Sequence, residues 1–417
     1  DKSNTSIAIL AQAPVRLQLP SRPTDGEPPA PRARLAAANM APALRTRDGK
    51  PVVQVLDDVT NSDLTAARNE YHYRMPYLVD KMLPLLKDPR DEPMLCLLVN
   101  IVQVLVPGVV IVYGLCLRVP PASAWAVHAA GLCYVATIMV LFMERFVLCL
   151  HFSSHRPIFQ KAWMNSAMSW VFAPMFGIPC GLYKLHHCVM HHIENNHELD
   201  ASSTEQFQRD SWLDFAGYWF RFVFLIHLEL PVYTLRTKRY EWFVSVIGGL
   251  ATWLCVIAFL AKCVNMTATV WVFVVPHFLA MSAMSFGNWA QHVFVDPTNC
   301  ASNYALTYNC IDTPVNQTTF NDGYHVIHHA NARLHWSEMP GALYATREKH
   351  LESGALTFRG VHFMDVGVMV MTKQLRKLAE CYVHLGTRET APTVDEVEAR
   401  LRSWLVPVPG AQAKKAS

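Results

Sequence analysis

Four apolar segments, each of roughly twenty residues, limit what this chain can fold into. They cover residues from about 94 to 117, 124 to 150, 242 to 261 and 269 to 289. A helix of about twenty apolar residues crosses the hydrocarbon core of a bilayer. Only 17% of the 417 residues are charged, whereas about 25% is usual in a soluble domain. Because the connections within the first and second pairs are short, the sequence predicts an all-α integral membrane protein with four transmembrane helices in two hairpins.

The stretch between the two hairpins has a different character. Residues 163–178 and 212–233 are aromatic and amphipathic, and the second piece carries Arg221 and Glu229. Helices of this kind lie in the membrane interface. In an alternative interpretation, residues 215–230 form a fifth span, which would place Arg221, His227 and Glu229 at bilayer depth, where polar groups are costly.

Basic residues indicate the orientation of the helices. The two short turns carry one basic residue each, Arg118 and Lys262, and almost every other Lys and Arg falls on the opposite side. By the positive-inside bias, the N-terminus, the central stretch and the C-terminal region face the cytosol, stroma or matrix. The first fifty residues are rich in Ala, Pro and Arg, as in the remains of an organelle-targeting region or in a Pro-rich linker. We therefore expect a plastid or mitochondrial membrane in preference to the endoplasmic reticulum.

The chain divides into three regions. Residues 1–93 are predicted to form a Pro-, Ala- and Arg-rich extension with an amphipathic lead-in, and residues 94–341 the membrane domain. Residues 342–417 are predicted to form a soluble extension with an amphipathic helix over 394–405. The net charge of +3 is too small to indicate a nucleic-acid partner. The eleven cysteines are scattered, so a disulfide framework is not expected, although Cys300 and Cys310 could pair in a loop.

Histidines gather in three clusters. These are His151 with His155, His187 with His191 and His192, and His325 with His328 and His329; a single histidine, His292, follows Asn288 by four residues. On a helix, residues three or four apart lie on one face, about 5–6 Å apart at Cβ. We therefore expect His151 and His155 to hold one ion between them, and likewise His187 and His191, with His192 turned toward a neighbouring ion.

In the third cluster, His325 pairs with His328 and with His329 by the same spacing. Imidazole suits iron, copper, zinc and nickel. Nine imidazoles are too many for one ion, which takes at most about six ligands, and they fit two.

The predicted topology brings all nine histidines to one membrane face. The first cluster lies at the end of the second span, and His292 lies at the end of the fourth. Two spans separate the second cluster from the third. With a fifth span, His292 and the third cluster would lie on the opposite face, so the convergence favours four spans and a histidine-rich cap. The isolated histidines are expected to be packed or solvated: His128, His227, His277, His350 and His362. His186, His197 and His335 lie close to the clusters and remain open.

These clusters resemble the membrane fatty acid desaturase and hydroxylase superfamily, which carries H-x3/4-H, H-x2/3-HH and H-x2-HH boxes on four spans. The resemblance covers roughly residues 94–341. The stretch from Asn288 to His292 resembles an N-x3-H ligand segment of acyl desaturases and alkane hydroxylases. The resemblance implies that the nine clustered histidines bind two irons and that Asn288 is a water-mediated ligand or supports one. It also implies O2 as co-substrate.

The sequence departs from the family pattern at three places. Phe152 follows the first histidine where an acid or Asp-Cys-Gly is common, three residues separate His187 from His191 as in alkane hydroxylases, and Gln291 replaces the usual Glu. The His-Pro-Gly-Gly haem motif of fused donor domains is absent, so we expect a separate electron donor, a ferredoxin or a small haem protein.

The resemblance implies desaturation of a fatty acyl lipid, with hydroxylation as the first alternative. A second alternative is a desaturase-like structural subunit of a larger membrane complex, and residues 1–90 are expected to pack on another protein or on the soluble face of this chain. Candidate acids to orient the imidazoles are Glu194, Glu198, Asp200, Asp296 and Asp322. An acyl tunnel is expected between the hairpins, lined by apolar residues such as Trp289, Phe286, Phe146 and Met143.

Overall fold

The computed structural model describes residues 51–65, 73–118, 120 and 124–408. These described residues belong to one compact unit. The predicted region boundaries at 94 and 342 fall inside this unit, and the division into three regions stays a prediction. The expectations for residues 1–50, a targeting function or a contact with a partner, fall outside the described residues.

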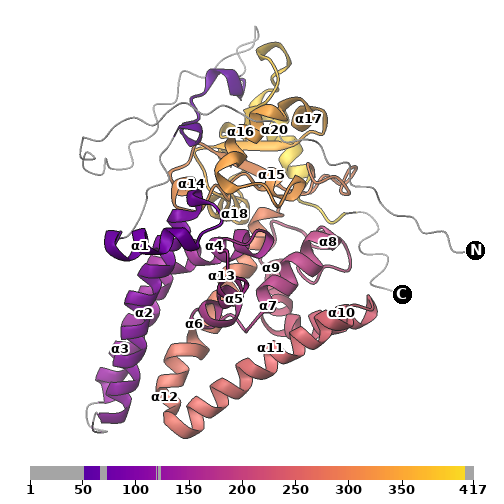
Figure 1. Ribbon diagram of the computed structural model, residues 1–417. Coiled ribbons are helices and arrows are strands. Elements are labelled where there is room, and N and C mark those ends of the chain that lie inside the picture. Colours follow the sequence, from indigo (N-terminus) through magenta and orange to yellow (C-terminus); the bar gives the residue numbers. More distant parts are fainter. Residues whose placement is uncertain (1–50, 66–72, 119, 121–123, 409–417) are drawn as a thin grey trace, which may run out of the picture. The chain divides into compact units, whose positions relative to one another are not determined.

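Long helices carry the apolar segments. They are α2 (Glu92–Arg118); α3 (Ala124–Thr137), η6 (Ile138–Met143) and α4 (Glu144–His155); α11 (Tyr240–Phe259) and η10 (Leu260–Val264); and α12 (Met266–Thr269), η11 (Val270–Val274) and α13 (Val275–Gln291). Figure 1 shows α2 and α3 running side by side. This first pair packs against α12 and η11 of the second.

Five helical stretches are long and apolar enough to cross a membrane: Pro89–Arg118, Trp125–His155, Trp212–Arg236, Tyr240–Val264 and Met266–Gln291. Four of them contain the predicted spans. The fifth combines α9 (Trp212–Phe220), η9 (Arg221–Leu225) and α10 (Ile226–Arg236). It is the segment that the sequence assigned to the interface, with a fifth span as the alternative. Length and composition therefore establish an integral membrane protein with five candidate helices, one more than the four predicted.

The predicted interfacial helix at 163–178 is a run of short helices that ends in a tight turn. The run consists of α5 (Ala162–Ala167), η7 (Met168–Phe172) and α6 (Ala173–Met175). Gly177 then has φ +79°, and a Cβ built there would lie 2.2 Å from the backbone nitrogen of His277. Nδ1 of His277 lies 2.7 Å from the carbonyl oxygen of Gly177. This contact fixes the central stretch to α13 just before α7 (Leu182–Lys184), η8 (Leu185–His191) and α8 (His192–Glu194).

Beyond α13 the chain folds into a cap of short helices and strands. The helices are α14 (Pro314–Thr318), α15 (His325–Ala330), α16 (Met339–Ala345), α17 (Arg347–Glu352), α18 (Phe363–Met371), α19 (Leu375–Glu380) and α20 (Val394–Ser403). Helix α20 confirms the predicted amphipathic helix, since it buries Val394, Val397 and Leu401. Two parallel two-stranded sheets complete the described cap: β2 (Tyr308–Ile311) with β3 (Leu356–Arg359), and β1 (Gln54–Val55) with β4 (Val383–His384).

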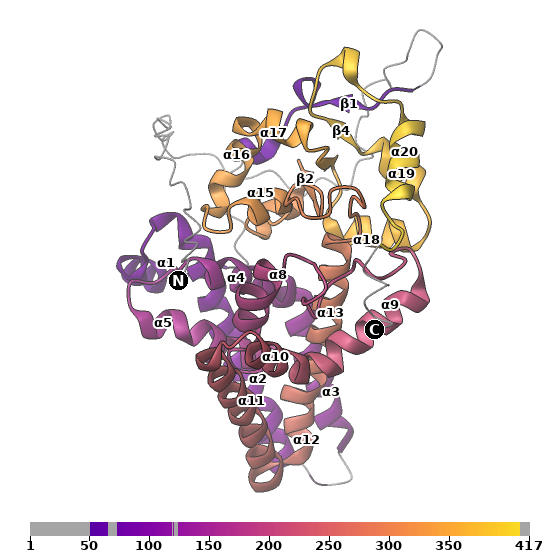
Figure 2. The same cartoon turned by 90° about the vertical axis from the view of Figure 1, so that its right-hand side faces the viewer.

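Residues 51–65 belong structurally to this cap, as Figure 2 shows for β1 beside β4. The buried carboxylate of Asp63 accepts hydrogen bonds from the hydroxyl of Tyr324 (2.9 Å), the amide of Asn316 (2.9 Å) and the backbone N–H of Asp312 (2.8 Å). Because Tyr324 directly precedes the third histidine cluster, this network fixes the start of α15. Residues 51–65 thus pack on the soluble face of their own chain, one of the two expected arrangements for the N-terminal extension.

A second buried charge connects the central stretch to both ends of the cap. The guanidinium of Arg209 is fully buried and donates to the carbonyl oxygens of Val293 (3.0 Å), Trp404 (2.8 Å) and Val406 (2.7 Å). Burial lowers the pKa of Arg209 to about 10, which leaves it charged at pH 7. All eleven cysteines are free, including Cys300 and Cys310, so the loop disulfide does not form.

We expect Gly177→Ala to destabilise the protein by about 2 kcal/mol or more, because the left-handed backbone and the clash with His277 both oppose a Cβ. Gly114→Ala is the matched control, since a Cβ there meets nothing within 4 Å. Thermal unfolding in detergent should show a fall in Tm for the first variant only. Equal Tm values for the two variants would contradict this account of the turn.

Candidate metal centre

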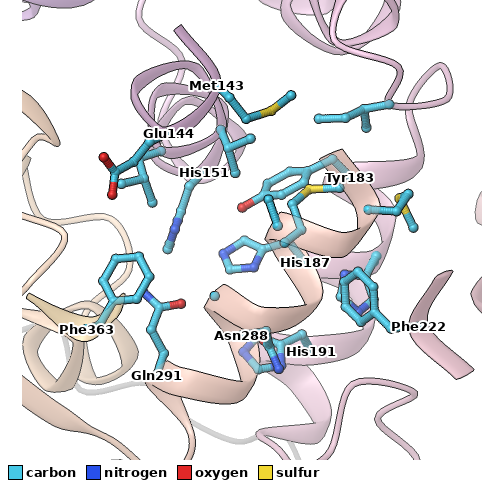
Figure 3. A pocket seen from close by; sticks show the side chains of 18 of the residues that line it. Met143, Glu144, His151, Tyr183, His187, His191, Phe222, Asn288, Gln291 and Phe363 are labelled. Carbon is cyan, nitrogen blue, oxygen red and sulfur yellow. The ribbon is translucent and has the colours of Figure 1, made fainter. Parts of the chain in front are cut away.

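The nine clustered histidines come from four elements that end at one place. His151 and His155 lie in the last turn of α4, His187 and His191 on η8, and His192 on α8. His292 follows α13, and the third cluster lies on α15. Seven of the nine are buried, and His155 and His192 are partly buried. Figure 3 shows His151, His187 and His191 directed into the same space.

A first group contains five histidines. One ring nitrogen of each of His151, His155, His187, His192 and His328 lies within 4.8 Å of those of the others. The Nε2 atom of His328 is 2.6 Å from that of His151 and 2.9 Å from that of His192. The Nε2 atom of His192 is also 3.1 Å from that of His187. A neutral imidazole has one N–H and one lone pair, so a cation among these nitrogens satisfies more of them than mutual hydrogen bonds can.

A second group contains His191, His292 and His329, again with ring nitrogens within 4.8 Å. The Nε2 atoms of His292 and His329 are buried and have no hydrogen-bond partner. The ring of His325 adjoins this group, 4.9 Å from that of His329 and 5.5 Å from that of His292 between centroids. Buried polar atoms without a partner are rare and costly, and these two face a space in which a metal would bind them.

The opposite ring nitrogens of the second group are held by fixed acceptors. Nδ1 of His191 lies 2.6 Å from the carboxylate of Asp200, that of His292 3.0 Å from the carbonyl oxygen of Leu306, and that of His329 3.2 Å from the side-chain oxygen of Asn195. Each acceptor selects the tautomer with the proton on Nδ1, which leaves the Nε2 lone pair for a metal.

Electrostatics keeps these imidazoles in the form that binds a metal. Burial lowers the pKa of His187, His192, His325, His328 and His329 well below the usual value, and the neighbouring imidazoles lower it further. Burial also lowers the pKa of His292 to about 3. These rings are therefore neutral at pH 7, as metal binding requires.

The helix type changes which histidines share a group. The sequence paired His187 with His191, but His187 lies with His192 in the first group and His191 in the second. The reason is that η8 is a π-helix, in which residues five apart are hydrogen-bonded neighbours, so His187 and His192 meet. The predicted pairing assumed α-helical spacing and is wrong. The third cluster also divides, since His328 joins the first group and His329 the second.

Of the five candidate acids, two contact the histidines. Asp200 contacts His191, and Oδ1 of Asp322 lies 3.3 Å from Nδ1 of His151. Burial alone would raise the pKa of Asp200, but His191 and the Ser202 hydroxyl outweigh it and lower the pKa. Burial raises the pKa of Asp322 to about 8, and the charge of Glu144 adds to this.

The other three acids are engaged elsewhere or exposed. Glu194 accepts a hydrogen bond from the Tyr233 hydroxyl at 2.6 Å, Asp296 accepts one from the backbone N–H of Thr298 at 2.8 Å, and Glu198 is exposed.

The sequence did not reveal three groups that orient the imidazoles. Asn195 ends α8 in the left-handed conformation, where Asn is common, but this preference gives no sign of the contact with His329. The carbonyl of Leu306 carries no sequence signal at all. Gln291, noted only as a departure from the family pattern, donates to Asp322 at 2.7 Å and lies 3.3 Å from Nδ1 of His325.

A cavity of about 340 Å³ adjoins both groups. Its wall includes His151, His187, His191 and His325, together with the side chain of Asn288. The amide of Asn288 donates to the carbonyl oxygen of Ser202 (3.0 Å) and to the Tyr218 hydroxyl (2.8 Å). Asn288 therefore lies beside the histidines, held by the loop that also carries Asp200.

Of the four residues expected to line an acyl tunnel, only Met143 lines this cavity. The α13 residues in its wall are Met281, Ala283, Met284, Gly287, Asn288 and Gln291. Phe286 and Trp289 lie on the opposite face of α13, where both contact Phe215. Phe146 stacks on Phe176, with ring centroids 4.1 Å apart. The prediction is wrong for these three because it used proximity in sequence and not helix face.

The other histidines of the described residues lie outside the two groups. Three of those close to the clusters have other partners: His186 lies 3.0 Å from the Ser202 hydroxyl, His197 2.8 Å from the Glu205 carboxylate and His335 3.0 Å from the Asp91 carboxylate. The isolated histidines His128, His227, His277, His350 and His362 belong to neither group.

Comparison with known families agrees with this geometry. The family model for fatty acid desaturases matches residues 100–360. No curated protein and no solved structure matches the chain. The matched range starts within α2, ends after β3 and contains all nine converging histidines as well as the cavity wall from Met139 to His325. The chain therefore belongs to the fatty acid desaturase family.

Proposed function

We propose that this protein is an oxygen-dependent di-iron enzyme that introduces a double bond into the acyl chain of a lipid. The observation that carries the proposal is the convergence of nine imidazoles beside an apolar cavity. The first group would hold one iron through five histidines, and the second group with His325 would hold the other through four. Imidazole is a suitable ligand for iron, and the family generally uses two irons.

The irons, when bound, supply the oxygen chemistry that removal of hydrogen from an unactivated C–H bond requires. The chain orients the substrate and keeps water away from it. Met143, Leu148 and Met284 form part of an apolar wall that leads past His151 and His187, so an acyl chain in this cavity passes the histidines. Asn288, fixed by two hydrogen bonds, supports this wall and is placed to hold a water or a ligand. The apolar wall limits the access of bulk water to the reacting carbons.

Four of the five candidate helices are proposed to cross the membrane. The histidines of the second cluster precede the segment Trp212–Arg236, and those of α15 follow it by two further spans. If that segment crossed, the two sets would lie on opposite faces, yet His191 lies beside His292 and His329. Near its two ends, Tyr218 contacts Asn288 and Tyr233 contacts Glu194. Both observations support an interfacial segment.

A separate electron donor is proposed to approach on the side of His155. A polar cavity of about 480 Å³ borders His155 and is lined by Lys87 and Lys184 and by several serines. Both lysines are exposed, and neither forms an ion pair within the described part of the chain. An acidic ferredoxin or small haem protein would be complementary to this surface. A plastid or mitochondrial location, proposed from residues 1–50, is compatible with such donors.

Two alternatives remain proposals with distinct consequences. Hydroxylation uses the same ligand set, and the three-residue spacer from His187 to His191 favours it. Gln291 in place of Glu favours desaturation. A desaturase-like subunit of a larger complex would bind iron and give no product with any donor.

We expect His328→Ala and His191→Ala to lower the iron content and to abolish activity, because each removes a nitrogen from one group. The control is His128→Ala, which alters an exposed histidine that contacts Trp271. Elemental analysis of purified protein should find about two irons per chain in the wild type and in the control. One zinc and no iron in freshly prepared wild type would contradict the di-iron proposal.

We expect expression in a host with a simple lipid profile to give new lipids lighter by two hydrogens, because the proposed reaction removes two C–H hydrogens from one chain. Mass analysis of extracted lipids measures this, with the His328→Ala variant as the inactive control. Lipids heavier by one oxygen would instead identify a hydroxylase. Iron-loaded protein that forms no product with any donor would favour the structural-subunit alternative.

We expect Lys184→Glu to raise the KM for the reduced donor by about fivefold to tenfold and to leave kcat nearly unchanged, because charge at an interface rim acts mainly on encounter. The difference should shrink at high salt. Lys377→Glu is the control, since Lys377 is exposed on α19 of the cap and does not line the cavity. Equal effects of the two substitutions, or turnover of the purified chain with a nicotinamide cofactor alone, would reject this docking site.

A further inference from the structure

The cavity beside the metal centre has two unlike ends. Figure 3 shows Glu144 and Phe363 on one side of His151, and Phe222 on the other. The wall near Phe222 includes the apolar side chain of Ile226 and the ring of His186, whose centroid lies 5.5 Å from that of Phe222. Burial lowers the pKa of His186 to about 4, so this end carries no charge at pH 7. A chain with one polar and one apolar end can therefore lie in this cavity in only one favourable direction, with its apolar end toward Phe222.

Glu144 is the most exposed residue of the cavity wall. Its side chain is 49% exposed, whereas every other wall residue is buried or partly buried. Glu144 therefore marks the opening, together with Phe363 of the adjacent α18. Helix α4 rises about 1.5 Å per residue, so the opening lies about 10 Å along α4 from His151. In a substrate that enters here, the carbons that reach the histidines are remote from the headgroup.

The carboxylate of Glu144 has no cationic partner within the described part of the chain. The nearest basic ring, that of His362, has Nδ1 at 3.6 Å, and burial lowers the pKa of His362 to about 4, so this ring is neutral at pH 7. The charge that acts on Glu144 is that of Asp365, a second acid. The opening of an apolar cavity thus carries a carboxyl group that lacks a cationic partner among the described residues.

From this arrangement we infer that the opening binds the ammonium group of a zwitterionic lipid headgroup, with Glu144 as the specificity-determining residue. This inference rests on the proposed function and names its substrate class. A carboxylate attracts the ammonium charge directly, and the ring of Phe363 offers a π-face of the kind that binds quaternary ammonium groups. The same opening repels lipids whose headgroup carries only negative charge, such as a glycerophosphate or a nucleotide thioester.

The test compares headgroups at constant acyl composition. Iron-loaded full-length protein is placed in nanodiscs of phosphatidylcholine or of phosphatidylglycerol with identical chains. Both initial turnover and competitive binding of alkylphosphocholine against alkyl phosphate of equal chain length are measured. The wild type should prefer the choline headgroup by about tenfold, which corresponds to one ion pair or cation–π contact.

Glu144→Gln should lower this preference severalfold, and Glu144→Lys should reverse it. Glu241→Lys is the matched control, because Glu241 is an exposed carboxylate at the start of α11 that lines no observed cavity, and it should keep the wild-type preference. All variants must retain wild-type iron content and elution volume, and the isosteric Gln variant serves where the Lys variant fails to fold.

Two results would overturn the inference: a wild type that binds both headgroups equally, or a Glu144→Lys variant that keeps the choline preference. Binding and turnover separate this inference from the proposed function. A choline preference in binding without any product supports the headgroup site and rejects the reaction. Product formation with no dependence on Glu144 supports the reaction and rejects the headgroup site.

Discussion

The fold depends on holding nine imidazoles together in a buried space where their lone pairs cannot be hydrated. Buried unpaired nitrogens such as Nε2 of His292 and His329 oppose folding by about 1–3 kcal/mol each. Under the proposed function, metal ions at the two groups would turn this cost into binding energy, and metal affinity and fold stability would be coupled. The histidines come from elements as far apart in sequence as α4 and α15, and each element is held in place by contacts of its own.

These contacts form a continuous network around the loop that follows α8. Asp200 contacts His191 and accepts hydrogen bonds from the backbone N–H and hydroxyl of Ser202. The carbonyl of Ser202 in turn accepts from Asn288 in the cavity wall. Arg209 connects the end of this loop to the segment after α13 and to the C-terminal segment. A substitution at Asp200 or Ser202 should therefore act on the histidine groups and on the cavity wall together.

Sequence patterns predicted the features that depend on composition and spacing. Apolar length located four of the five long apolar helices, and the histidine spacing identified all nine rings that converge. The grouping of the rings was not predictable from spacing, because the π-helical turn over Leu185–His191 changes which residues are neighbours, and no residue type marks such a turn. The prediction of the cavity wall failed for a related reason. Phe286 and Trp289 are apolar and near the histidines in sequence, but they lie on the face of α13 that points away from the cavity. Hydrogen-bond acceptors such as the carbonyl of Leu306 meet the imidazoles only through tertiary contacts, and no sequence pattern indicates such contacts.

The two cavities beside the histidine groups differ in the charge of the residues that line them. This difference allows a different reactant to approach from each side. The apolar cavity borders His151, His187, His191 and His325 and opens at Glu144, whereas the polar cavity borders His155 and is lined by Lys87 and Lys184. Under the proposed function, electrons arrive through the imidazoles from the basic side and the substrate from the acidic side. Neither reactant then blocks the other, and the donor surface can stay hydrated while the substrate wall stays dry. An anionic donor that reached the acidic opening would be repelled there, so charge alone directs each reactant to its own side of the histidines.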